Sequence, residues 1–176
     1  MNHHVRALDA PIALGAMPIG QRMITHDAGF ARASVRAVFD VVRAVERWPA
    51  HLPHYRWVRM LERDPDGGGV VEMSANRPFG PLDWPTYWRS LMAVDHARPA
   101  VRFRHIGGVT TGMDVEWAFD ATDEGTQITL VHSWDGPSWP FIGRFAAQEV
   151  IGPVFVHGIA SLTLAGLARA AEQGDR

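Results

Sequence analysis

Two histidines lie in segments whose alternating pattern is typical of β-strands. His105 follows Phe103, and His132 follows Leu130, in both cases at a spacing of two residues. Side chains two apart point to the same face of a strand, so both histidines are predicted on an apolar, inward face. An imidazole titrates near neutral pH and can transfer a proton or bind a ligand. His105 and His132 are therefore the candidate catalytic residues; the alternative is two core histidines bonded to their neighbours.

Tryptophans are predicted on the same inward faces. Trp117 and Trp134 alternate with polar residues in a pair of strand-like segments, and Trp88 lies in a third. Indole rings contribute large apolar area to any core, and they also stack on flat ligands. The three tryptophans are predicted to form one wall of an interior space, as ligand contacts or as core.

Several chemistries are excluded by residue types that the chain lacks. It has no cysteine, and its 17 basic residues are all arginines. A thiolate nucleophile, a thiolate metal site, a Schiff base and a P-loop lysine are therefore ruled out. Ser90 lacks the Gly-x-Ser-x-Gly turn of a serine hydrolase. His51 and His54 are spaced as some metal ligands are, but no third ligand is apparent nearby, so no metal or other cofactor is expected.

Periodicity predicts the elements that position these residues. Ser34 is suited to cap a helix in which Val35, Val38, Phe39 and Val42 recur at helical spacing, and a short strand is expected before it within 22–33. A proline-containing turn follows, and then consecutive strands that predict an antiparallel sheet. These strands are expected at 55–63, 70–77, 86–94, 100–106 and, as a hairpin, within 112–136.

Three further segments complete the organisation. Residues 1–21 have no clear period and are predicted to be an N-terminal extension of a single domain that spans 22–176, partly ordered against it. The prolines of 76–85 predict an irregular loop: a flap at a cavity mouth, a contact with another subunit or an ordinary hairpin loop. Residues 141–172 predict a long C-terminal helix, with a break at Gly152-Pro153.

Charge patterning assigns the outer face of the sheet. Arg102 and Arg104 alternate with apolar residues in one strand, as Asp114 and Glu116 do in the next. If the two strands pair, arginines face carboxylates across an exposed surface. The opposite face, with the histidines and tryptophans, is then interior.

The composition suits one soluble domain. The chain has 176 residues, 47% of them hydrophobic and 20% charged, and a net charge of −2. Neither nucleic acid nor an anionic membrane is an expected partner at this charge. No apolar run approaches the roughly 18 residues of a membrane span, so membrane insertion is not expected. There is no recognisable secretory signal, and the absence of cysteine favours a cytoplasmic location. The oligomeric state stays open.

Three segments give the chain a resemblance to the SRPBCC, or START-like, superfamily, and within it to the polyketide cyclase/dehydrase and lipid-transport branch. They are VFDVVRAVERWPAHLPHYRWVRMLER, VRFRHIGGVTTGMDVEWAFDATDEGTQITLVHSW and FVHGIASLTLAGLARAAE, and the resemblance extends over roughly 23–172. It implies an α+β helix-grip fold, in which a curved antiparallel sheet wraps around the C-terminal helix and encloses an apolar cavity.

The resemblance also implies roles for residues of the strand at 86–94. Aromatase/cyclase members carry a Trp-x-Trp-Val-Ser-x-Arg pattern there, whose arginine contributes to the pocket. Trp88 and Ser90 fit this pattern, but the arginine position falls on Met92, which counts against cyclisation of an aromatic polyketide. Tyr55 fits a pocket tyrosine of that branch. The candidate ligand-binding residues are Tyr55, Trp88, Ser90, Met92, Trp117 and Trp134.

These inferences predict binding of an apolar, ring-containing or polyketide- or lipid-like small molecule. As an enzyme, the protein would act without a cofactor, by cyclase/aromatase-type acid–base chemistry. One alternative is a non-catalytic carrier of a lipid or quinone. Another is an interaction module with a filled cavity and an exposed apolar patch. The sequence does not separate the enzyme from the carrier, because the same cavity serves both.

Overall fold

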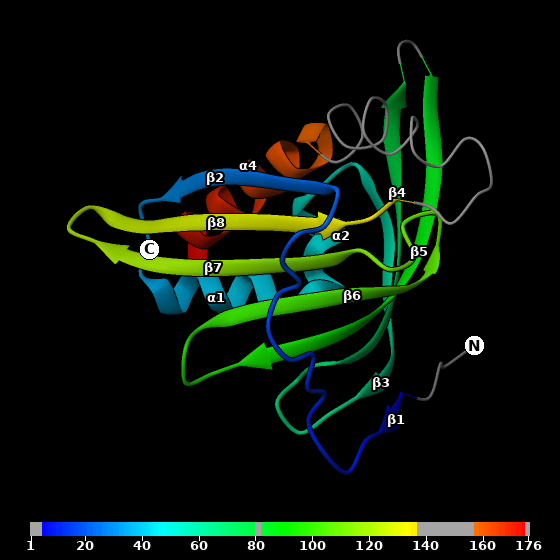
Figure 1. The fold of residues 1–176 in the computed structure, drawn as a ribbon. Coiled ribbons are helices and arrows are strands. Elements are labelled where there is room, and N and C mark those ends of the chain that lie inside the picture. Colours follow the sequence, from blue (N-terminus) through cyan, green and yellow to red (C-terminus); the bar gives the residue numbers. More distant parts are fainter. Residues whose placement is uncertain (1–4, 80–81, 137–156, 175–176) are drawn as a thin grey trace.

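A single eight-stranded sheet is the main element of the computed structural model, which describes residues 5–79, 82–136 and 157–174 (Figure 1). The strand order is β1-β3-β4-β5-β6-β7-β8-β2, and every neighbouring pair is antiparallel except β1 and β3. The strands are β1 (Arg6–Ala7), β2 (Met23–Ala31), β3 (Tyr55–Arg63), β4 (Gly69–Phe79), β5 (Leu82–Asp95), β6 (Ala100–Gly108), β7 (Asp114–Thr122) and β8 (Gly125–Trp134). The predicted antiparallel sheet is confirmed, and β1 is a strand that the sequence did not predict.

The helices lie on one side of the sheet, behind it in Figure 1. The first is α1 (Val35–Arg43), and the Ser34 Oγ accepts a hydrogen bond from the backbone N–H of Ala37 at 3.3 Å, so the predicted cap is confirmed. A 3-10 turn, η1 (Val45–Arg47), and the single-turn helix α2 (Trp48–His51) follow. The C-terminal helix α4 spans His157–Gly174. The predicted helical residues before it, with the break at Gly152-Pro153, lie outside the described residues.

Two glycines allow close packing of helix α4, one against the edge strand β2 and one against the end of α2. A Cβ atom at Gly29 of β2 would lie 3.3 Å from the Leu164 Cδ2. A Cβ atom at Gly166 would overlap the side chain of Leu52, which follows α2. Leu164, Leu167 and Ala171 of α4 are buried against this inner side, so the sheet does wrap around the C-terminal helix.

In the segment 76–85, the described residues form extended strands and not the irregular loop that the prolines predicted. Strands β4 and β5 continue through it and pair as far as Phe79 with Leu82. The Asn76 N–H donates to the His54 carbonyl at 2.8 Å, so the backbone at this position faces β3 rather than β5. Pro85 pairs with Asn76, and Pro78 lies two residues beyond Asn76 with the same orientation. Both proline nitrogens therefore point away from the β4–β5 ladder, where a missing N–H costs no hydrogen bond.

The outer face of the sheet is covered by the N-terminal segment, which crosses in front of the strands in Figure 1. Arg102 donates to the Gly15 carbonyl, and the Ser133 Oγ donates to the Pro18 carbonyl at 3.3 Å. The predicted pairing of Arg102 and Arg104 with Asp114 is confirmed, with 2.9 Å between the Arg104 Nη2 and the Asp114 Oδ1. The predicted exposure is wrong for Arg102 and Asp114, whose side chains are only 11% and 5% exposed, whereas the Arg104 side chain is 38% exposed.

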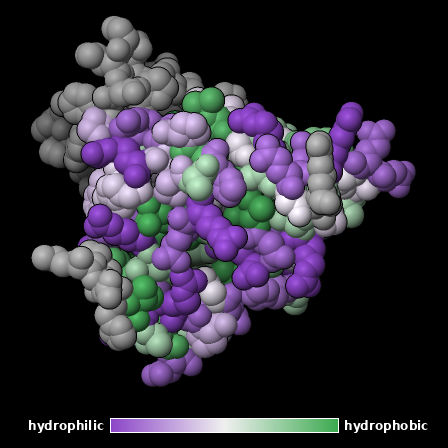
Figure 2. Space-filling model, turned by 180° about the vertical axis from the view of Figure 1, so that it is seen from behind, coloured by the Kyte–Doolittle hydropathy of each residue, from purple (hydrophilic) through white to green (hydrophobic). Residues whose placement is uncertain are grey.

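The helix-bearing side of the molecule has a mixed surface. Figure 2 shows apolar residues scattered between polar ones there, rather than gathered in one patch. None of the described helices is both long and apolar enough to cross a membrane.

Candidate functional site

A chain of aromatic rings lies on the inner face of the sheet. Tyr55 at the start of β3 makes an edge-to-face contact with Trp88 of β5, with ring centroids 5.9 Å apart. The Trp88 ring stacks on His105 of β6 at 6.2 Å, with 25° between the planes. On its other side Tyr55 contacts Trp48 at 5.3 Å, and Trp48 contacts Trp117 of β7 at 5.9 Å. Four of the candidate residues are thus brought together, around a Trp48 that the sequence analysis did not select.

The rings of Tyr55, Trp88 and His105 are called the aromatic wall below. Polar atoms lie beside it where β5 pairs with β6. The His105 Nδ1 is 2.6 Å from the Thr110 Oγ1, a hydroxyl in the turn that follows β6. Ser90 pairs with His105 across the two strands and is completely buried. Its Oγ has no hydrogen-bond partner among the described residues. A buried hydroxyl without a partner costs about 1–3 kcal/mol, so this position is suited to an additional polar atom.

Met92 and Trp134 also lie on the inner face, but deep in the core. Met92 is fully buried and pairs with Phe103 of β6. Trp134 is 1% exposed, and its indole N–H donates to the Thr111 carbonyl at 3.0 Å. Because that donor is already used by the backbone, the geometry of Trp134 fits a core residue that fixes the β6–β7 turn. The structure does not bring these two residues into the ring contacts of Tyr55, Trp88 and His105.

His132 belongs to a second polar position, on β8 beside the edge strand β2. It pairs with Thr25, and its Nδ1 is 3.2 Å from the Thr25 Oγ1. The same nitrogen is 4.0 Å from the Asp27 Oδ2, and the Asp27 side chain is only 2% exposed. Sequence reasoning missed Asp27, although it lies four residues, an even number, from both Met23 and Ala31, and this spacing would have placed it on their face. Strand β7 separates His132 from His105, so the two histidines form separate positions.

The His51 and His54 pair is not arranged as a metal site. The His54 Nε2 lies 3.1 Å from the Thr163 Oγ1 and so links the start of β3 to α4, whereas His51 is exposed. Within residues 5–79, 82–136 and 157–174, no three His, Asp or Glu side chains are grouped as ligands would be.

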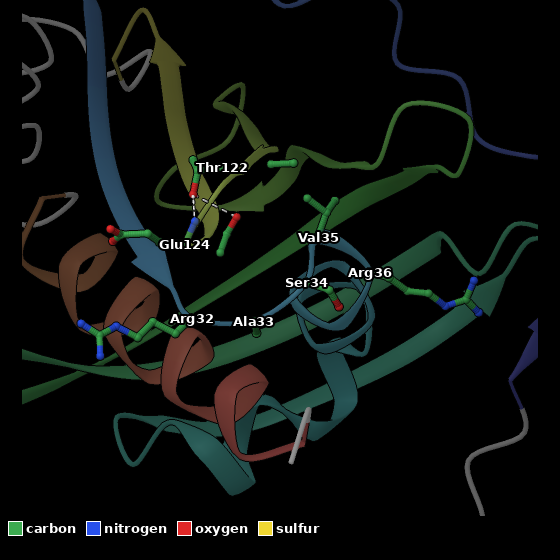
Figure 3. Close-up of a pocket in the computed structure, with 9 residues that line it drawn as sticks. Arg32, Ala33, Ser34, Val35, Arg36, Thr122 and Glu124 are labelled. Atoms are coloured by element: carbon green, nitrogen blue, oxygen red, sulfur yellow. Dashed lines mark hydrogen bonds between the residues drawn. The ribbon is translucent and has the colours of Figure 1, made fainter.

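A shallow surface depression lies at the other end of the sheet. It is formed by the residues that lead into α1 and by the β7–β8 turn, and none of the candidate residues lines it. In Figure 3 the Arg32 and Arg36 side chains point away from each other, and the Thr122 hydroxyl is used by the turn itself. This depression is therefore separate from the aromatic wall.

Glu72 and Tyr87, on the outer face, have shifted pKa values. Burial alone would raise the pKa of Glu72, but hydrogen bonds from Tyr87 and Arg89 outweigh it and hold this pKa below its ordinary value. Burial and the bond to Glu72 raise the pKa of Tyr87. This network is on the opposite side of the sheet from Trp88 and Ser90 and has no part in the inner site.

Comparison with known proteins gives a family match over most of the chain. Residues 32–149 match the model of the polyketide cyclase/dehydrase and lipid transport family. No protein of curated function matches the sequence significantly.

Solved structures resemble the fold at low sequence identity. The Zhui aromatase/cyclase from Streptomyces sp. R1128 is 20% identical with a TM-score of 0.75, over 87% of this chain and 95% of that one. A START superfamily protein from Mycobacterium smegmatis is 15% identical with a TM-score of 0.62, over 87% and 97%. A major latex-like protein from Panax ginseng is 12% identical with a TM-score of 0.63, over 86% and 96%. These likenesses establish the α+β helix-grip fold.

Proposed function

The chain belongs to the polyketide cyclase/dehydrase and lipid transport family, and from this membership we propose that it binds an apolar, ring-containing small molecule between the sheet and α4. The ligand would lie against the aromatic wall of Tyr55, Trp88 and His105. Sites for small molecules are mostly apolar with a few placed polar groups, and this wall has that composition.

The unsatisfied Ser90 hydroxyl is the observation that carries the proposal. It is fully buried beside His105 and has no hydrogen-bond partner among the described residues. If this position served stability alone, alanine would be favoured over serine, because a buried hydroxyl without a hydrogen bond is destabilising. A bound ligand that offers a carbonyl or hydroxyl oxygen would satisfy it. The proposed ligand is therefore an apolar ring system that carries at least one oxygen.

As an enzyme, the protein would use a histidine for proton transfer. The His105 Nδ1 is engaged by Thr110, so a ligand would meet the Nε2 edge of this ring. The stacking of His105 on Trp88 holds the imidazole in one orientation. A fixed base at hydrogen-bond distance can abstract a proton beside a carbonyl and return it, which is the step needed for cyclisation or dehydration of a polyketide-like chain.

A non-catalytic carrier of a lipid or quinone is the second candidate, and Met92 favours it. Met92 stands at the position that the resemblance assigns to a pocket arginine, and it is fully buried. Without that cation the interior offers less stabilisation to a negatively charged intermediate. A carrier needs only an apolar space and a hydrogen bond, and the aromatic wall and the buried Ser90 hydroxyl support this role.

Native mass spectrometry of the freshly purified protein, followed by solvent extraction, tests the proposal directly. A stoichiometric adduct of an oxygen-bearing apolar compound is the expected result, and incubation with that compound then separates turnover from storage.

Binding of the fluorescent apolar probe N-phenyl-1-naphthylamine gives a second test that does not depend on copurification. Replacing Trp88 by Leu should weaken probe binding about fivefold, because ring stacking contributes on the order of 1 kcal/mol. Trp57 on the outer face is the control, since Trp57→Leu leaves the inner wall intact. Equal affinities for the wild type and both variants, together with a clean ligand-free mass, would count against an interior site.

A further inference from the structure

The structure also places a buried carboxylate against His132, apart from the aromatic wall. We propose that Asp27 and His132 form an acid–base pair on the inner face of β2 and β8, in which the Asp27 carboxylate balances the positive charge of an imidazole that Thr25 holds in place. The inference rests on the proposed function, because the pair would act on the same interior ligand. Asp27 is the positioning residue, and His132 is the group that would meet the ligand.

Strand register brings the two residues together. Thr25 pairs with His132, and Asp27 pairs with Leu130, so Asp27 lies one inner-face position along β2 from the histidine. The distances from the His132 Nδ1 are 3.2 Å to the Thr25 Oγ1 and 4.0 Å to the Asp27 Oδ2. Both neighbours approach the same nitrogen. The Thr25 contact is of hydrogen-bond length and holds the ring with its Nε2 on the edge away from β2, whereas Asp27 lies beyond that length and acts on the ring through its charge.

Burial separates the roles of the two side chains. The Asp27 side chain is 2% exposed, whereas that of His132 retains 12%. A carboxylate buried to this degree is costly unless a cation compensates it, and an imidazolium 4.0 Å away is suitable for that purpose. The histidine keeps the small exposed fraction that access by a ligand requires.

Other described charged groups do not compete for this position. His26 is exposed on the outer side of β2, and Asp114 and Glu116 of β7 bind arginines on the outer face. Asp120 of β7 is exposed and lies five residues along the strand from Val115, the cross-strand partner of His132. Glu172 of α4 accepts a hydrogen bond from the Arg32 N–H, beyond the far end of β2. Besides Asp27, the charged and titratable groups described on the neighbouring strands and on α4 are His26, Asp114, Glu116, Asp120, Arg169 and Glu172, with His105 across β7.

The pair supports a balanced proton transfer. The His132 Nε2 would take a proton from an acidic C–H or O–H of the ligand, and the bonding electron pair would stay on the ligand as an enolate or alkoxide. The imidazolium so formed is stabilised by the Asp27 carboxylate. Return of the proton to another ligand atom restores the neutral imidazole, so no other reactant is needed.

NMR titration of the histidine Cε1–Hε1 resonances in the full-length, ligand-free protein tests the pairing. In Asp27→Asn the titration midpoint of His132 should move to lower pH, because removing the anion disfavours the imidazolium. The His105 resonance is the internal control, and Asp120→Asn on the exposed end of β7 is the matched variant. An unchanged His132 midpoint in a folded Asp27→Asn protein would overturn the pairing.

Addition of 2-naphthol, an apolar ring with one acidic hydroxyl, tests whether His132 meets a ligand. The His132 resonance should shift on saturation in the wild type, and the shift should shrink at least twofold in Asp27→Asn. Binding of 2-naphthol without any change at His132 would refute the ligand-facing role. If the protein bound neither 2-naphthol nor N-phenyl-1-naphthylamine, that result would argue against the proposed function. The titration of the ligand-free protein would still test the pairing of Asp27 with His132.

Discussion

Ser90 and Ser74 are two buried serines on neighbouring strands with opposite hydrogen-bond status. The Ser74 Oγ of β4 donates to the Thr86 carbonyl at 2.8 Å, whereas the Ser90 Oγ of β5 has no partner within the described part of the chain. Both are almost inaccessible to solvent, at 2% and 0% exposure. Ser74 faces the outer side of the sheet and Ser90 the inner side, so the same change from serine to alanine compares a bonded hydroxyl with an unbonded one.

Ser90→Ala should stabilise the ligand-free protein, because it removes a buried hydroxyl that lacks a bond. The expected gain is up to about 1 kcal/mol, whereas Ser74→Ala should cost about 0.5–1.5 kcal/mol. Urea unfolding measures both values. In the same pair, Ser90→Ala should weaken binding of an oxygen-bearing apolar ligand such as 2-naphthol and Ser74→Ala should not. A loss of stability in Ser90→Ala as large as that in Ser74→Ala would mean that the hydroxyl has a partner.

Individual site residues were predictable only where a strand period revealed their face. Alternation placed His105, Trp88 and Trp117 on the inner side of the sheet, and the register agrees. Trp48 was missed because it lies in a one-turn helix with no period, where only tertiary contacts reveal which rings it touches. Asp27 was missed because an acid in an edge strand is normally taken as solvent-facing.

The β5–β6 pair holds the polar side chains of the aromatic wall through an irregular backbone. The register shifts between Arg89 and Ser90, opposite the end of β6. Gly108 has a φ of +91°, and a Cβ atom there would overlap the Tyr87 carbonyl oxygen. The neighbouring Gly107 has no such conformation, and its Cβ atom would meet only the Arg89 Cβ, at 3.5 Å.

Gly108→Ala should therefore destabilise the protein by about 1–3 kcal/mol through backbone strain, with further loss from the overlap. Gly107→Ala should lie within about 0.5 kcal/mol of the wild type. Thermal and urea unfolding measure the difference. The His105 Cε1–Hε1 resonance should also move in Gly108→Ala, since the junction positions that ring. If both alanines were tolerated equally, the junction would not depend on the left-handed glycine.

On the outer side of the same strands, Glu72 provides a pH-dependent contribution to stability. It accepts hydrogen bonds from the Tyr87 hydroxyl at 2.7 Å and from the Arg89 Nε at 3.0 Å, which hold its pKa below the ordinary value of 4.5. A carboxyl with a depressed pKa adds stability that is present above its unfolded-state pKa and is lost as the pH falls through its folded-state pKa.

Glu72→Gln should consequently be less stable than the wild type at neutral pH, and the difference should vanish in acid, below the folded-state pKa. Unfolding midpoints measured across the acidic range provide the test, with Glu124→Gln in the exposed β7–β8 turn as control. A difference that persists unchanged to low pH would show that packing, not ionisation, accounts for the effect of Glu72.

Helices and strands were predicted well where period and capping agreed, and poorly where local residue types were misleading. The predicted strand at 55–63 and the Ser34 cap are both confirmed. The prolines at 78 and 85 predicted a loop, yet their nitrogens face away from the shared ladder and the hairpin continues. A proline interrupts a strand only if its nitrogen faces the neighbouring strand to which it would have to donate a hydrogen bond. The direction of that nitrogen depends on how the strands pair, and the local sequence does not reveal the pairing.

At the scale of the whole molecule, the two faces of the sheet bear different sets of side chains. The inner face carries the aromatic wall and the Asp27–His132 pair. The outer face carries ion pairs beneath the N-terminal segment, including Asp114, which is 5% exposed. Sequence reasoning described that outer surface as exposed, because nothing in an aperiodic extension indicates where it docks. The covering segment is held by contacts remote in sequence, such as the Ile12 N–H donating to the Asp64 Oδ2 at 2.9 Å.

Because the N-terminal segment covers only the outer face, we predict that substitutions in this segment lower the stability of the protein without affecting ligand binding. Leu14 is 8% exposed against the outer face, so Leu14→Ala should cost about 1–3 kcal/mol through lost apolar burial. Ile19, in the same segment, is 93% exposed, and Ile19→Ala should cost almost nothing. Affinity for N-phenyl-1-naphthylamine should stay within about twofold of wild type in both, since a pre-formed site on rigid strands is insensitive to a change on the opposite face. A weakened affinity in Leu14→Ala alone would mean that the covering segment helps to shape the interior, and the two faces would then have to be treated as one coupled unit.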